Sequence, residues 1–233
     1  MSGLDLEPSK LGTQEHWDQV YKNEVVNFVD IGDEGEIWFG SDSVDKMVSW
    51  AVEHIPPSSN PSILEVGSGN GTLILALLDE DYPAKGLAGI DYSADAVKLS
   101  KLVAASRDGG DVTFNICDFL KEDPPHLSHM DLTATDVWDL LLDKGTYDAI
   151  ALGPKDEHGS SPAARYPARA ARLVKPGGFF LITSCNFTEE ELKANFISQE
   201  TGFQYHSRIK HPSFTFGGKS GNVYCSVAFR KTS

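Results

Sequence analysis

The chain has 233 residues, of which 40% are hydrophobic and 23% are charged, as in one globular domain rather than a disordered segment. Twenty basic and thirty-four acidic residues give a formal charge of −14. This argues against direct nucleic-acid binding, because phosphate contacts need clustered Lys and Arg; it favours a neutral or basic partner, or serves only solubility. No apolar stretch approaches the roughly 18 residues that span a membrane. Residues 1–10 are polar and acidic, which predicts a flexible tail without a secretory signal and hence a cytoplasmic protein.

The three cysteines are an odd number, widely scattered and without metal-ligand spacing, so no metal site is expected. Cys117, Cys185 and Cys225 each lie in a run that predicts a strand. We therefore expect three buried, reduced thiols.

Two amphipathic helices are predicted before residue 60. The first follows Thr13, a residue type that caps helices, and places on one face Trp17, Val20, Tyr21, Val25 and Phe28. The second begins near Ser43 and ends at Pro56 and Pro57, since proline breaks a helix interior. Between them lies the aromatic segment 35–40, which has a glycine at each end.

Five apolar runs alternate with helical segments after residue 60: 63–66, 87–90, 112–117, 137–142 and 179–183. This alternation predicts a parallel sheet with helices on both faces. Two further runs, 203–209 and 223–229, are joined by a short turn-rich segment and must pair antiparallel, because parallel strands need a long crossover. We therefore predict an α/β fold whose seven-stranded, mostly parallel sheet ends in an antiparallel hairpin. Ser93 is expected to cap one helix, and Thr188 with Glu191 forms a capping box for another.

The strongest local signal follows the first strand, at Glu65-Val66-Gly67-Ser68-Gly69-Asn70-Gly71. Glycines here let the backbone approach a ligand and turn from strand into helix. The dinucleotide fingerprint requires a third glycine at position 72, where the chain has Thr72, so a nicotinamide-dependent oxidoreductase is disfavoured. The E-x-G-x-G-x-G pattern resembles motif I of S-adenosylmethionine-dependent methyltransferases. A tight turn without a ligand is the alternative interpretation.

Acidic residues end or follow the next three strands. Asp91 is placed to accept hydrogen bonds from both ribose hydroxyls of a nucleoside. In methyltransferases of this class, the residue at the position of Asp118 binds the adenine amine while its neighbour, here Phe119, packs on the ring. Asp143 ends the fourth strand, where such chains pass the transferable methyl, so we expect it to face the acceptor; a helix cap is the alternative. The N-P-P-Y-type motif of adenine and glutamine methyltransferases is absent from the sequence, which disfavours both substrates.

Longer strings give the chain a resemblance to one eukaryotic family. The most distinctive are Asp143-Lys144-Gly145-Thr146 and the run 181–188, Leu-Ile-Thr-Ser-Cys-Asn-Phe-Thr. With these, the chain resembles the lysine methyltransferases that modify translation elongation factor 1-alpha. The resemblance implies a class I methyltransferase with a Rossmann-like fold and S-adenosylmethionine as cofactor. Residues 61–233 would form its core and residues 11–60 a helical lid over substrate and cofactor. Departures lie at 121–136 and 153–166, and Pro167 interrupts an expected helix.

The resemblance also implies a protein substrate, elongation factor 1-alpha, for a cytoplasmic monomer that uses no metal, nucleic acid or membrane. A lysine amine has a pKa of about 10.4 and must lose its proton, which burial in an aromatic channel favours. We expect Asp143 and Tyr147 to be catalytic, and Trp38, Phe39 and Asn186 to contact the substrate. Cofactor binding is assigned to Trp38, Glu65, Gly67, Gly69, Asn70, Asp91, Tyr92, Asp118, Phe119 and Asp143.

Alternatives stay open for several of these assignments. Trp38 and Phe39 equally fit core positions that pin the N-terminal helices, and Asn186 fits the cap of the following helix. No residue is identified as the general base, which leaves water to take the proton. A small-molecule methyltransferase and a non-catalytic S-adenosylmethionine-binding scaffold are the alternative functions.

Overall fold

A seven-stranded sheet forms the centre of the computed structural model, which describes residues 6–130, 133–135, 137–211, 214–216, 219–221 and 223–232. The strand order is β3-β2-β1-β4-β5-β9-β6. The first five strands are parallel, whereas β9 pairs antiparallel with both β5 and β6. The predicted α/β fold with an antiparallel C-terminal pair is therefore confirmed. The strands are Ile63–Val66 (β1), Leu87–Asp91 (β2), Thr113–Ile116 (β3), Trp138–Lys144 (β4), Val174–Ser184 (β5), Phe203–Ile209 (β6) and Cys225–Lys231 (β9).

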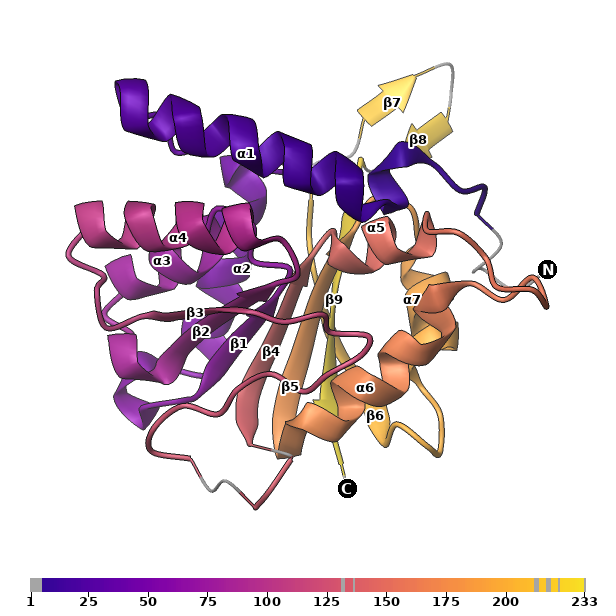
Figure 1. Cartoon of the computed structure of the whole chain (residues 1–233). Helices are drawn as coiled ribbons and strands as arrows, with labels where there is room; N and C mark the ends of the chain where they lie inside the picture. The colour runs from indigo at the N-terminus through magenta and orange to yellow at the C-terminus, as the bar shows by residue number, and fades with distance from the viewer. Residues whose placement is uncertain are drawn as a thin grey trace.

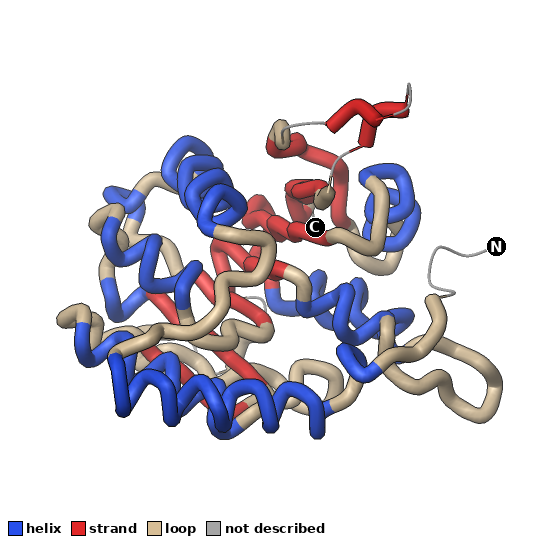
Figure 2. Tube along the Cα trace, turned by 90° about the horizontal axis from the view of Figure 1, so that it is seen from above, coloured by secondary structure: helices blue, strands red, loops and turns tan. Residues whose placement is uncertain are grey.

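Helices flank the sheet on both sides, as Figure 1 shows from the front and Figure 2 from above. Their bounds are Gln14–Ile31 (α1), Ser41–His54 (α2), Thr72–Asp79 (α3), Ala94–Ser106 (α4), Thr146–Ala151 (α5), Tyr166–Leu173 (α6) and Glu189–Phe196 (α7). A separate two-stranded sheet of Phe214–Phe216 (β7) and Lys219–Gly221 (β8) lies within the predicted turn-rich segment.

Side chains that alternate along each strand enter two separate cores, because successive residues point to opposite faces. Ile63, Leu87 and Leu140 pack with α2, α3 and α4. Leu64 and Leu141 pack with α5, α6 and α7. All four residues of β1 are buried, as expected of a parallel strand covered on both faces.

Residues 11–60, predicted as a helical lid, divide between the core and the surroundings of the main cavity. Helix α2 belongs to the core, where Met47 and Ala51 are fully buried. Leu11 and Gly12, the first part of α1 and the segment 33–40 border the main cavity described below. Residues 6–10, predicted as part of a flexible tail, instead run along the body: Leu6 packs against the core and the N–H of Ser9 donates to the carbonyl oxygen of Leu152 at 3.0 Å. Residues 1–5 of that tail lie outside the described residues.

Of the three predicted helix caps, two lack the expected side-chain hydrogen bond and one has it. Thr13 precedes α1, but its hydroxyl donates to the carbonyl oxygen of Lys10 at 2.8 Å instead of capping the helix. Ser93 precedes α4, and its hydroxyl has no partner among the described residues. The Thr188–Glu191 capping box of α7 is confirmed. Pro167 lies in the first turn of α6, where its missing N–H is not needed, so it begins that helix rather than interrupting one.

The cysteines are free but not equally buried. Cys117 is buried and Cys225 half-buried, whereas Cys185 is exposed because it follows the end of β5. The prediction of a buried thiol is therefore wrong for Cys185. Within the described part of the chain, no cluster of His, Cys, Asp and Glu side chains has the arrangement of a metal site. No helix found there is both long and apolar enough to cross a membrane.

Candidate active site

A cavity of about 420 Å³ opens at the carboxyl ends of the parallel strands, where ligands bind in open α/β sheets. Four strand ends and the N-terminal segment contribute to its wall. Among its lining residues are 66–70, Asp91, Tyr92, 117–121, 144–146, Leu11, Gly12, Gln14, Trp17, Tyr21, Glu36 and Trp38. Eight of the ten predicted cofactor-binding residues line this one cavity: Trp38, Gly67, Gly69, Asn70, Asp91, Tyr92, Asp118 and Phe119. Lys144 and Tyr21, for which no ligand contact was predicted, line it as well.

The glycine turn after β1 brings bare backbone to the cavity wall. Gly67 and Gly69 have φ values of +65° and +53°, a conformation that favours glycine. A Cβ on Gly67 would lie 2.1 Å from Oγ1 of Thr146, which donates to the carbonyl oxygen of Val66 at 2.8 Å. A Cβ on Gly69 would lie 2.5 Å from the hydroxyl oxygen of Tyr21. Both glycines are therefore required by close packing as well as by backbone conformation.

Asp91 connects the glycine turn to the start of α4. Its Oδ2 accepts from the N–H of Gly69 at 3.1 Å, and its Oδ1 accepts from the N–H of Ser93 at 2.9 Å. Burial raises the pKa of Asp91 to about 6, and the two N–H donors oppose that rise. The carboxylate thus lines the cavity as an ion at neutral pH with lone pairs left to accept, as a ribose-binding residue requires. Tyr92 beside it directs its hydroxyl to the carbonyl oxygen of Thr13 at 3.5 Å.

Asp118 and Phe119 form the wall after β3. Oδ1 of Asp118 accepts from the N–H of Leu120 at 3.0 Å, and Oδ2 lies 2.8 Å from Nζ of Lys121. The ring of Phe119 packs against Tyr166 with centroids 4.7 Å apart. A fixed apolar ring beside a carboxylate suits an adenine base, so the residues present fit the predicted nucleoside.

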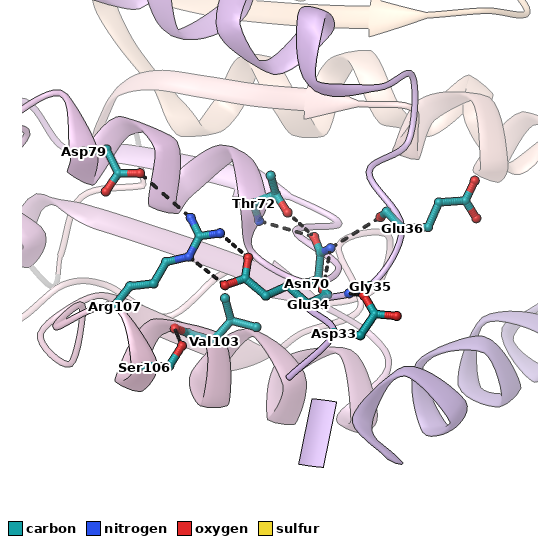
Figure 3. Close-up of polar contacts among 10 residues, drawn as sticks. All are labelled: Asp33, Glu34, Gly35, Glu36, Asn70, Thr72, Asp79, Val103, Ser106 and Arg107. Carbon is teal, nitrogen blue, oxygen red and sulfur yellow. Dashed lines mark hydrogen bonds and ion pairs between the residues drawn. The ribbon is translucent and has the colours of Figure 1, made fainter. Parts of the chain in front are cut away.

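Asn70 connects the glycine turn to the N-terminal segment, and Figure 3 shows its contacts with Glu34, Glu36 and Thr72. Its Nδ2 donates to the carbonyl oxygens of Glu34 and Glu36 at 3.0 and 3.3 Å. Its Oδ1 accepts from the hydroxyl of Thr72 at 2.8 Å. Arg107 of α4 pairs with Glu34, with 2.9 Å between Nε and Oε1. The predicted cofactor residue Asn70 therefore has an observed role in fixing the segment 33–40.

Asp143 lies below the cavity and not in its wall. It is fully buried, and its carboxylate accepts from the N–H groups of Thr146 and Tyr147 and from the hydroxyl of Tyr166 at 2.9, 3.0 and 2.5 Å. Burial raises its pKa to about 7. Tyr147 is also fully buried, between the rings of Tyr166 and Phe187. Helix capping and core packing enclose both residues, so neither lines the cavity, and their catalytic roles stay predictions.

Glu65 is buried as well and does not line the cavity. Its Oε2 has no hydrogen-bond partner among the described residues. Burial raises the pKa of Glu65, and the nearby ammonium of Lys144 opposes the rise. Burial in turn lowers the pKa of Lys144. Because the cost of burial exceeds the attraction of the pair, both groups shift towards their neutral forms. Glu65 lies under the glycine turn, and its direct contact with a cofactor stays a prediction.

The two aromatic residues of the segment 35–40 have different surroundings. Trp38 lines the cavity, 4.9 Å from Trp17 between ring centroids, and its carbonyl oxygen accepts from Nζ of Lys144 at 3.2 Å. Phe39 has a φ of +65° and its ring stacks on Tyr224 with centroids 5.5 Å apart. Phe39 is therefore neither a core residue nor part of the cavity lining.

Asn186 is exposed and lines the second hollow instead of the cavity. It does not cap the following helix, since Thr188 does so. Its own N–H donates to Oδ1 of Asp148 at 3.1 Å. A substrate contact of Asn186 would therefore have to occur outside the cofactor cavity.

Comparisons with known proteins agree with this geometry. A family model described as "Methyltransferase domain" matches residues 57–220. The chain is 37% identical to mouse "EEF1A lysine methyltransferase 2" over 227 residues, which cover 97% of this chain and 86% of the relative. It is 38% identical to Schizosaccharomyces pombe "Protein-lysine N-methyltransferase efm4" over 243 residues, covering 99% and 97%. The crystal structure of the N-methyltransferase NodS from Bradyrhizobium japonicum with S-adenosyl-L-homocysteine aligns with a TM-score of 0.56 and 12% identity, covering 93% and 99%, and shares the fold.

Proposed function

Because the chain belongs to the S-adenosylmethionine-dependent protein-lysine N-methyltransferases, we propose that its substrate is a lysine side chain of translation elongation factor 1-alpha. The similarity to EEF1A lysine methyltransferase 2 and efm4 over nearly the whole chain carries this proposal. The predicted enzyme class and the cofactor S-adenosylmethionine are confirmed. The identity of the target protein is the part of the proposal that the experiment below tests.

The cofactor supplies an electrophilic methyl group, so the chain has to bind the cofactor and the acceptor, orient them towards each other and exclude water. The backbone at Gly67 and Gly69 provides close approach, and the carboxylate of Asp91 has free lone pairs for ribose hydroxyls. Phe119 supplies an apolar surface for adenine and Asp118 an acceptor for its amine. These assignments rest on the fit of the residues to a nucleoside.

The acceptor is proposed to enter beside Trp38, where the aromatic segment meets the end of β4. Aromatic faces attract an ammonium ion, and burial among Trp17 and Trp38 disfavours its charge, so that the amine loses its proton more readily. Asp143 and Tyr147 are enclosed in the core, so we assign neither of them to proton transfer. Water takes the proton in this proposal.

The decisive experiment incubates the purified chain with radiolabelled S-adenosylmethionine and unmethylated elongation factor 1-alpha, and locates the methyl group by mass spectrometry. Transfer to one lysine is expected, and Asp91→Ala should abolish it by weakening cofactor binding. Label on small molecules only would favour the small-molecule alternative. Cofactor binding without transfer to any protein in an extract would favour the scaffold.

We also propose that the protein acts as a cytoplasmic monomer without direct nucleic-acid contact. The formal charge of −14 opposes binding to phosphates. Light scattering after size exclusion should give a mass near 25.4 kDa; a dimer mass would contradict the proposal.

A further inference from the structure

A second hollow of about 550 Å³, called here the side groove, lies beside the cofactor cavity. It is lined by residues 184–189, 208–211 and 223–226, which come from the ends of β5, β6 and β9 and the start of α7. None of the cofactor assignments uses it.

One aromatic pair separates the side groove from the cavity. The ring of Phe39 stacks on Tyr224, which lines the groove. The same ring would lie 3.1 Å from a Cβ on Gly145, which lines the cavity. The strand ends behind this pair are also neighbours, since the N–H of Gly145 donates to the carbonyl oxygen of Thr183 at 3.0 Å. A substrate chain in the groove would therefore lie next to the part of the cavity wall that Gly145 forms.

The floor of the groove is held in a fixed conformation by one buried carboxylate. Asp148 accepts from the hydroxyl of Ser184 at 2.6 Å and from the N–H groups of Cys185 and Asn186 at 3.0 and 3.1 Å. Asp148 is 5% exposed, so these bonds are shielded from water. A fixed floor suits a binding surface, because little ordering is needed when a ligand docks.

The charge of the groove is opposite to that of the chain. The chain carries 34 acidic and 20 basic residues, but the groove lining contains Arg208 and Lys210 and a single acid, Glu189. Glu189 is already paired with Lys193 at 2.7 Å and with Arg208 at 3.0 Å. Lys210 is exposed and has no ion pair among the described residues. Burial lowers the pKa of His211, so it adds no charge at neutral pH.

We propose that the side groove binds the polypeptide on one side of the target lysine, and that Lys210 recognises an acidic residue in that segment. The inference rests on the proposed function and adds a sequence preference to it: the enzyme selects a lysine that has Asp or Glu close by in the chain. Arg208 contributes less than Lys210, because its guanidinium is shared with Glu189.

The test measures steady-state kinetics of wild type, Lys210→Glu and Lys98→Glu with unmethylated elongation factor 1-alpha. Lys98 is an exposed lysine of α4 outside both hollows and is the matched control. Because charge reversal replaces attraction by repulsion, Lys210→Glu should raise KM for the protein about tenfold. kcat and the Kd for S-adenosylhomocysteine should stay at the wild-type values, and Lys98→Glu should resemble wild type in every constant.

Peptides that contain the methylated lysine extend the test. Replacing the flanking acid by Lys should raise KM for wild type and lower it for Lys210→Glu, as expected of a direct charge pair. An unchanged KM in Lys210→Glu, or a methylated lysine with no acid within about four residues, would overturn the inference while leaving the proposed function intact. Absence of any transfer to elongation factor 1-alpha by wild type would overturn both.

Discussion

Asp91→Asn is expected to weaken cofactor binding and to remove the pH dependence of stability that a buried carboxylate causes. Asparagine carries no charge, so it removes the cost of a buried ion, but its amide nitrogen cannot accept one of the two N–H bonds that the carboxylate accepts from Gly69 and Ser93. The carboxylate of Asp91 is 4% exposed. Burial raises its pKa from 3.8 to about 6, and this difference corresponds to about 3 kcal/mol.

The sign of the pH dependence follows from the raised pKa. The folded protein holds the proton of Asp91 more tightly than the unfolded chain, so this group's contribution to stability is present at low pH and is lost as pH rises through about 6. The variant lacks this titration. The unpaired N–H should lower its free energy of unfolding by about 1–3 kcal/mol at every pH. Relative to wild type, that free energy should rise by about 1 kcal/mol between pH 5.5 and pH 8, because only wild type pays the growing cost of the buried ion.

Cofactor affinity should fall. A hydrogen bond to a charged group contributes about 1.5–3 kcal/mol, so the loss of the carboxylate should raise the Kd for S-adenosylhomocysteine roughly 10- to 100-fold. Titration calorimetry measures this Kd, and urea unfolding at the two pH values measures stability. Asp111→Asn, at an exposed position before β3, is the control. A Kd within threefold of wild type would refute the role of Asp91, and a stability difference that does not vary with pH would refute the buried ion.

Three further variants distinguish residues that bind the cofactor in the cavity wall from residues that stabilise the core beneath it. Phe119→Ala should raise the Kd for S-adenosylhomocysteine about tenfold in calorimetry, because base stacking on an aromatic ring contributes about 1–3 kcal/mol; an unchanged Kd would contradict the adenine assignment. Tyr166→Phe removes the hydroxyl that donates to Asp143 and should lower the free energy of unfolding in urea by about 1–3 kcal/mol, with no change in Kd. Lys144→Met leaves Glu65 without its nearby cation, so stability should fall as pH rises through the raised pKa of Glu65. Adding Glu65→Gln should restore it, and failure of that rescue would count against the pair.

The sequence predicted the sheet and most of the cofactor wall because both depend on local signals. Apolar runs locate strands, and glycines directly after a buried strand predict a tight turn where the backbone can approach a ligand. Asp91, Asp118 and Phe119 follow β2 and β3 at the same edge, so their order along the chain was sufficient. The contacts of Asn70 with Glu34 and Glu36 join residues more than thirty positions apart, and no local pattern predicts such a pair.

Residues placed on the acceptor side were predicted less well, since their partners are distant in sequence. Asp143 has the same setting as Asp91, an acid at the end of a buried strand. Only the structure shows that Tyr166, from a helix 23 positions later, donates to Asp143 and closes it off. Asn186 follows β5 as the acids follow other strands, but the aromatic pair of Phe39 and Tyr224 places it beyond the cavity.

Strand register explains why Lys144 rather than Asp143 belongs to the site. Val66 of β1 pairs with Asp143 of β4 and with Ile90 of β2, so these three residues share one face. Glu65 precedes Val66, Asp91 follows Ile90 and Lys144 follows Asp143, so these three neighbours lie on the other face of the sheet. That face carries the α3–α4 core and places the Lys144 ammonium near Glu65 below the glycine turn. In strands buried on both faces, hydrophobicity does not alternate, and the sequence alone therefore cannot choose between the two neighbours.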